Sequence, residues 1–157
     1  MNTKAFVLLF ALITISSSAS NLLLSTIDLV FDKDRKFQIK DKGDEVKSFL
    51  NKHNTIGLMP KKYYELIKNN FSKNNFKCYT KITYSGDIYK KFYCKKTRYV
   101  DFSTIKLNFN FENFTLSLTE AELFKVKGDD FYFNFLSNDK VNILTIPTKL
   151  LEGKTNV

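Results

Sequence analysis

Several residue types that would point to a particular chemistry are scarce in this chain. Histidine occurs once, at His53, and cysteine twice, at Cys78 and Cys94, which is too few for a four-ligand zinc site. Arginine occurs only at Arg35 and Arg98, and no arginine-rich recognition helix is visible. These shortages argue against a metalloprotein and against a nucleic-acid-binding protein, and we expect no cofactor.

Long apolar runs are also lacking. A membrane-spanning helix needs about 20 apolar residues, and no stretch after the first twenty residues reaches that length. Lys4, the apolar residues 5–15 and the small residues 18–20 instead have the pattern of a secretory signal peptide. An uncleaved anchor is the alternative. We expect a mature chain that starts near Asn21, has no stable membrane span, and is secreted or lies in an endolysosomal or vacuolar lumen.

The positive charge comes almost entirely from lysine. The formal net charge is +9, and removal of the leader with Lys4 leaves 24 basic and 16 acidic residues, a net charge of +8. Because the lysines are spread along the whole chain, we interpret the charge mainly as a compositional feature that favours solubility. An anionic surface as partner is the alternative.

Export to an oxidising compartment favours a disulfide between Cys78 and Cys94. The bond would close a loop of about 17 residues and contribute roughly 3 kcal/mol in the chain-entropy model. A Cys–His nucleophile pair is a weaker alternative, because nothing near either cysteine suggests an activated thiolate.

Two segments match the acceptor pattern for N-glycosylation, Asn70-Phe71-Ser72 and Asn113-Phe114-Thr115. We expect both asparagines to be exposed, Asn70 at the end of a helix and Asn113 at the tip of a hairpin.

The clearest secondary-structure signal lies at residues 105–118. Apolar and polar residues alternate there with a period of two, interrupted by Glu112-Asn113, which predicts a β-hairpin. Thr119 and Glu122 follow at capping-box spacing and predict a short helix over residues 119–124.

The rest of the chain predicts further short elements. Residues 25–31 resemble 103–109 at a spacing of 78, and a second alternating segment follows each, so a repeated hairpin is one interpretation and chance similarity the other. An amphipathic helix is expected to begin at Pro60, with Tyr63, Ile67 and Phe71 on its buried face and Tyr64 and Leu66 widening that face. The other expected elements are strands at 46–50, 79–84, 88–93, 131–135 and 141–146. We predict an all-β fold, mainly β with two short helices and sandwich- or barrel-like, in a single domain over residues 21–151, with a tail at 152–157.

Three landmarks occur in an order that resembles the C-terminal lobe of a pepsin-like aspartic protease. They are residues 49–60 with the helix that follows, the hairpin at 105–118 with the helix at 119–124, and the segments 131–135 and 142–144. The resemblance covers about residues 46–151. It implies a single lobe with a ψ-loop that is crossed by the 141–146 strand.

The resemblance places Asn51 at the position of the family's catalytic aspartate. Lys52 and His53 then stand at Thr/Ser-Gly, Asn54-Thr55 at the Thr/Ser pair, and Thr145-Ile146 at a Gly-Asp pair. Both cysteines precede the hairpin, whereas familiar members pair one before it with one after. The chain is one lobe long, so the aspartate of a partner lobe is not in this sequence.

An aspartic protease needs two carboxylates about 3 Å apart that share one proton. Asn51 cannot titrate, and loss of a general acid–base group lowers the rate typically by about 10²-fold to 10⁴-fold. Asp44 and Glu45 in a predicted turn, and Asp101 before the hairpin, have no positional support as substitutes.

Three functions follow from these observations. The first is a catalytically inactive protease-like lobe that acts by binding a peptide or a second protease-like lobe, or that is a decaying copy. The second is an active aspartic endopeptidase completed by another lobe or chain. The third is an unrelated secreted β-rich protein that binds an anionic surface or a small ligand through its aromatic residues and excess lysine.

Overall fold

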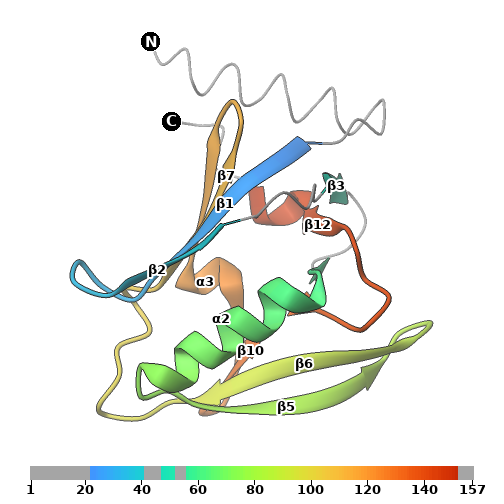
Figure 1. Ribbon diagram of the computed structural model, residues 1–157. Helices are drawn as coiled ribbons and strands as arrows, with labels where there is room; N and C mark the ends of the chain where they lie inside the picture. Colours follow the sequence, from blue (N-terminus) through green and yellow to red (C-terminus); the bar gives the residue numbers. More distant parts are fainter. Residues whose placement is uncertain (1–21, 41–46, 52–55, 152–157) are drawn as a thin grey trace.

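The computed structural model describes residues 22–40, 47–51 and 56–151 (Figure 1). The expected leader, the acidic residues Asp44 and Glu45, and the expected tail lie outside the described residues. The described chain is mainly β with two short helices, which confirms the predicted class. Its elements are β1 (Leu22–Val30), β2 (Lys36–Lys40), β3 (Lys47–Asn51), β4 (Gly57–Leu58), α2 (Lys61–Lys73), β5 (Lys77–Tyr84), β6 (Ile88–Lys95), β7 (Lys106–Phe111), β8 (Thr115–Thr119), α3 (Glu120–Leu123), β9 (Phe124–Lys127), β10 (Asp130–Phe133), β11 (Phe135–Leu136), β12 (Leu144–Pro147) and the 3-10 helix η1 (Thr148–Leu151).

The strands form three small sheets, two of which share β1. One sheet is antiparallel, with the order β2-β1-β7-β8, and a mixed sheet with the order β11-β4-β12-β3 joins it where β3 pairs with the start of β1. The third sheet is antiparallel, with the order β5-β6-β10-β9. Helix α2 lies between β1–β2 and the β5–β6 hairpin (Figure 1) and covers the inner face of each.

The two expected hairpins are both present, and they lie beside each other. Strand β1 pairs with β7 so that Leu29 lies opposite Leu107, and these two residues are the equivalent positions of the 78-residue repeat. Residues that resemble each other in sequence are therefore related by an approximate two-fold axis. The buried side chains of both strands, with a period of two, face the same core.

Helix α2 begins directly after Pro60, which is the N-cap rather than the first helical residue. Tyr63, Ile67 and Phe71 are buried as predicted, because spacings of four residues place them on one face. The expectation for Leu66 is wrong: its side chain is 39% exposed, since it lies at the margin of that face.

The core that α2 covers is largely aromatic. Phe71 lies at its centre, with ring centroids 5.2 Å from Phe31, 5.1 Å from Phe76, 5.8 Å from Phe92 and 5.7 Å from Phe124. Most of these contacts are edge-to-face or tilted, an arrangement that adds to the burial of apolar area. One helix side chain thereby joins residues from β6, β9 and the turn after β1.

The predicted strand at 131–135 is interrupted at Asn134. Its backbone N–H donates to the Leu123 carbonyl at 2.7 Å, its side-chain amide donates to the Glu122 carbonyl at 2.9 Å, and its own carbonyl accepts from Gly57. Because these bonds take Asn134 out of the β10 ladder, the chain passes from the third sheet to the mixed sheet there. Strands β4 and β9 were not predicted from the sequence. The last strand begins at residue 144 rather than 141 and includes Pro147.

Strand β12 lies between β3 and β4, which are consecutive in the chain. It runs parallel to β3 and antiparallel to β4, and it pairs with both. Two consecutive strands with a third strand inserted between them form a ψ-loop. The predicted crossing of the chain at this point is confirmed.

Candidate functional site

Asn51 is the last residue of β3, and its backbone pairs with Pro147 at the end of β12. The ladder that leads to this point is parallel and joins Leu144 to Ser48 at its start. Asn51 therefore stands where β3 leaves the sheet and enters the ψ-loop. Residues 52–55, with Lys52 and His53, lie outside the described residues, as does the side chain of Asn51.

The other end of the ψ-loop is a close backbone contact at Gly57. A Cβ atom on Gly57 would lie 2.4 Å from the Thr145 carbonyl oxygen and 2.6 Å from a ring carbon of Phe135. Real Cβ atoms do not approach other atoms this closely, so only glycine fits between β11 and β12 without a shift of the backbone. The Thr145 hydroxyl accepts a hydrogen bond from the Leu58 N–H at 2.9 Å and completes the contact.

A buried serine joins the crossing to the third sheet. The Ser137 hydroxyl donates to the Met59 carbonyl at 2.6 Å. The backbones of Ser137 and Lys90 exchange two hydrogen bonds, of 2.7 Å and 3.1 Å. These bonds fix the segment after β4 against β6, because each polar group at this buried position has a partner.

The described carboxyl groups with perturbed pKa values are all shifted downward. Hydrogen bonds from the Ser103 hydroxyl and N–H lower the pKa of Asp101, and a backbone N–H with the Arg35 side chain lowers that of Asp32. A backbone N–H of Ile88, helped by Lys140, lowers the pKa of Asp87, and Lys61 lowers that of Asp139. A carboxyl that holds a proton for general acid catalysis has a raised pKa, so none of these four groups has the property that the second member of a catalytic dyad needs.

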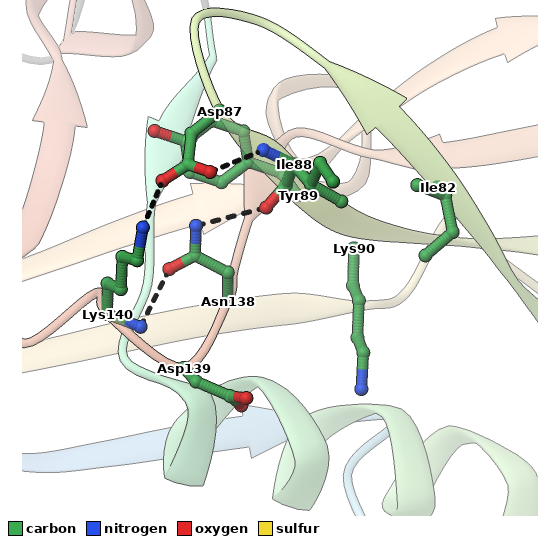
Figure 2. Close-up of a pocket in the computed structure, with 8 residues that line it drawn as sticks. All are labelled: Ile82, Asp87, Ile88, Tyr89, Lys90, Asn138, Asp139 and Lys140. Atoms are coloured by element: carbon green, nitrogen blue, oxygen red, sulfur yellow. Dashed lines mark hydrogen bonds and ion pairs between the residues drawn. The ribbon is translucent and has the colours of Figure 1, made fainter.

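A shallow pocket of about 260 Å³ lies beside the turn between β5 and β6 (Figure 2). Its lining is Ile82, Asp87, Ile88, Tyr89, Lys90, Asn138, Asp139 and Lys140. The pocket carboxylates are in ion pairs, Asp87 with Lys140 at 3.5 Å and Asp139 with Lys61 at 2.7 Å. The Asn138 side chain donates to the Ile88 carbonyl at 3.1 Å and so ties the two loops together. The volume is below the usual size of a small-molecule site, and we interpret the pocket as the joint between these loops.

The predicted disulfide between Cys78 and Cys94 is present. The two residues lie directly opposite each other in the β5–β6 ladder, and Cys94 is fully buried. The bond therefore joins β5 to β6 at the end of the hairpin away from its turn, where the Cys94 side chain is part of the buried core.

The expected exposure of Asn70 is wrong. The residue is 7% exposed, and its side-chain amide donates to the Leu66 carbonyl at 2.8 Å. Position 70 lies three residues after Ile67 and so belongs to the inward face of α2. Its amide nitrogen is held in this hydrogen bond in the folded chain, and glycosylation of Asn70 stays a prediction that the burial of the residue disfavours. Asn113 is exposed in the turn between β7 and β8, so glycosylation there remains a prediction.

Among the described residues, none of the helices is long and apolar enough to cross a membrane. The same part of the chain holds no group of three or more His, Cys, Asp or Glu side chains that could bind a metal ion. No protein-family model matches the chain, and no curated protein sequence matches it.

Proposed function

We propose that this chain is a secreted lobe of the pepsin-like aspartic protease type that has no proteolytic activity and acts by binding. The observation that carries the proposal is the ψ-loop. Strand β12 is inserted between β3 and β4, and Asn51 ends β3 at the position that the resemblance assigns to the catalytic aspartate.

The lack of activity follows from the chemistry of residue 51. The side-chain amide of Asn51 can donate and accept hydrogen bonds, but it cannot hold a negative charge or a transferable proton. Two identical copies of this chain would bring two asparagines together rather than two carboxylates. The four described aspartates with lowered pKa values are Asp32, Asp87, Asp101 and Asp139, and none of them supplies a replacement acid.

A protease assay on the purified full chain tests the proposal. The chain is incubated at acidic pH with an unfolded protein and with a fluorogenic peptide library, with and without pepstatin, beside pepsin as positive control. We expect no pepstatin-sensitive turnover from the wild type. We expect none from Asn51→Asp either, when it is assayed at a concentration at which size-exclusion chromatography shows a monomer, because one restored carboxylate in a single copy lacks a partner.

Pepstatin-sensitive turnover by the wild type would show an active endopeptidase and refute the proposal. An experimental structure in which residue 51 lies away from β12 would refute the assignment to the protease-like fold, whatever the assay shows.

A further inference from the structure

The outer face of the third sheet carries a dense group of lysines. Side chains alternate across a sheet, and the partners of β5, β6, β10 and β9 are in register, so one set of side chains lies together on the face away from α2. Figure 1 shows α2 on the other side of β5 and β6. The charged members of this Lys–Tyr face are Lys77, Lys81, Lys91, Lys95, Lys125, Lys127 and a single acidic residue, Asp130.

Three tyrosines form a row through the middle of the Lys–Tyr face. Tyr79 lies opposite Tyr93, and Tyr93 opposite Tyr132, with ring centroids 5.5 Å and 5.0 Å apart and planes inclined by 31° and 26°. The rings thus lean against each other. The ammonium groups of Lys81 and Lys91 lie 5.7 Å and 5.5 Å from the centroid of Tyr132. Tyr93 and Tyr132 are half-buried, and Tyr79 is 45% exposed, so the row offers one exposed ring rather than the several separate rings on which successive nucleobases stack.

The positive charge of the Lys–Tyr face is not neutralised within the face. Asp130 forms an ion pair with Lys95 at 3.1 Å, which leaves five lysines against no further carboxylate at the face positions of these four strands. Lys91 is half-buried, and its pKa is lowered by burial and then by the nearby ammonium groups of Lys127, Lys125 and Lys81. A bound polyanion would relieve this repulsion.

A membrane surface fits the Lys–Tyr face poorly. The exposed apolar residues of the β5–β6 hairpin are Tyr79, Ile82, Tyr84 and Ile88, of which Tyr84 is 78% and Ile88 53% exposed. Of these four, Tyr79 lies on the Lys–Tyr face. Ile82 and Tyr84 alternate with Lys81 along β5 and so lie on the opposite face, where Ile88 pairs with Tyr84. A bilayer in contact with the lysines would therefore meet the ring of Tyr79, which is 45% exposed, but none of the three more exposed apolar residues of this hairpin. Stable membrane binding normally needs a second, apolar signal, and one partly exposed tyrosine is a weak one.

We infer that the Lys–Tyr face binds a linear sulfated polysaccharide. Neighbouring strands place ammonium groups about 5 Å apart across the sheet and about 7 Å apart along each strand. This flat, regular arrangement matches closely spaced sulfates along a flexible chain, and it offers no deep pocket for the side chains of a peptide. Residue 51 is not part of the Lys–Tyr face. The protease assay therefore tests the proposed function, the binding experiment tests this inference, and the result of one does not decide the other.

Heparin is the probe for the test, with uncharged dextran as the negative control. The full wild-type chain is titrated with fluorescent heparin over a range of salt concentrations. The face variant is Lys81→Gln, Lys91→Gln, Lys127→Gln. The matched control, Lys33→Gln, Lys106→Gln, Lys149→Gln, makes the same charge change at exposed positions on other elements.

We expect heparin to bind and dextran not to bind. Each lysine near an anionic surface is worth about a fivefold change in affinity, so the face variant should bind about 100-fold more weakly. The slope of log affinity against log salt should fall by about one for each face lysine removed. The control variant should lose much less, because charges beyond about 10 Å are screened.

A second variant, Lys77→Gln with Lys125→Gln, leaves Lys81 and Lys91 in place beside Tyr132 and should also weaken binding. Circular dichroism and thermal melting verify that each variant is folded. Equal losses in the face and control variants, or no heparin binding by the wild type at low salt, would overturn the inference. Tighter binding to a single-stranded DNA oligonucleotide, or to vesicles of equal phosphatidylcholine and phosphatidylserine, would overturn it in favour of those partners.

Discussion

Replacement of Gly57 by alanine should disrupt the ψ-loop more than any other glycine substitution among the described residues. The new Cβ would lie 2.4 Å from the Thr145 carbonyl oxygen and 2.6 Å and 2.7 Å from two ring carbons of Phe135. Ordinary contacts of this kind are about 1 Å longer, so β4 would have to move away from both neighbouring strands.

That movement has a cost that can be worked out from the structure. Overpacking of a buried site costs about 1–3 kcal/mol. The same shift stretches the hydrogen bonds from Gly57 N–H to Asn134 and from Leu58 N–H to Thr145, both 2.9 Å long, and each is worth about 1 kcal/mol. We expect Gly57→Ala to lower the free energy of unfolding by about 3 kcal/mol or more.

Gly86 and Gly128 provide matched controls. Both have positive φ angles, +75° and +60°, and an added Cβ would meet no atom within 4 Å at either position. Alanine there suffers only the left-handed backbone penalty of about 1–2 kcal/mol. A milder variant at the crossing, Thr145→Val, keeps the shape but removes the acceptor of the Leu58 N–H and should cost about 1–3 kcal/mol.

Urea unfolding followed by circular dichroism measures these differences, with the m-value as a check that the unfolding transition is unchanged. If Gly57→Ala is no less stable than Gly128→Ala, the strands do not cross as closely as described and the reasoning is refuted.

Three further predictions concern other parts of the chain. Expressed in a eukaryotic secretory pathway, the protein should carry a glycan that Asn113→Gln abolishes and Asn70→Gln does not, as judged by mass before and after glycosidase treatment; loss of a glycan from the Asn70 variant would contradict the burial of that residue. Replacement of Cys78 and Cys94 by alanine should lower the free energy of unfolding by about 3 kcal/mol in urea, and an unchanged value would show that the hairpin does not need the bond. The four aspartates with lowered pKa values should make the melting temperature fall as the pH drops below their unfolded value of 3.8, because protonation then favours the unfolded chain; a rise in melting temperature on acidification would contradict these shifts.

Elements with one buried face could be predicted from the sequence. In β7 the apolar residues Leu107, Phe109 and Phe111 are buried and their neighbours are not, so the period of two was visible. In α2, Tyr63, Ile67 and Phe71 are buried at spacings of four residues, so the helical period was visible in the sequence as well. The capping box could also be predicted, because it involves only residues that are close in the sequence: the Thr119 N–H donates to the Glu122 carboxylate at 2.9 Å.

Elements defined by distant partners could not be predicted in this way. Strand β4 has two residues, and it is a strand only because β11 and β12 lie on either side of it. Strand β9 starts at Phe124, which the local pattern assigned to the preceding helix. The break at Asn134 depends on carbonyl groups of α3 and has no signature of its own.

The Lys–Tyr face has a signature in the sequence that differs from apolar periodicity. Residues 77–81 and 91–95 both have the pattern Lys-x-Tyr-x-Lys, and the antiparallel register aligns Lys with Lys and Tyr with Tyr. Because the cysteines lie within these segments, the disulfide alone fixes this register. The two patterns, combined with the disulfide, are therefore sufficient to predict a basic, tyrosine-containing face from the sequence.

The side-chain contacts described at the ψ-loop come from residues other than Asn51. The crossing is held by the fit of Gly57, the hydroxyls of Thr145 and Ser137, and the backbone ladder between β3 and β12. None of these interactions uses the side chain of residue 51. Under the proposed protease-like assignment, an asparagine in place of an aspartate at position 51 therefore leaves these described contacts in place.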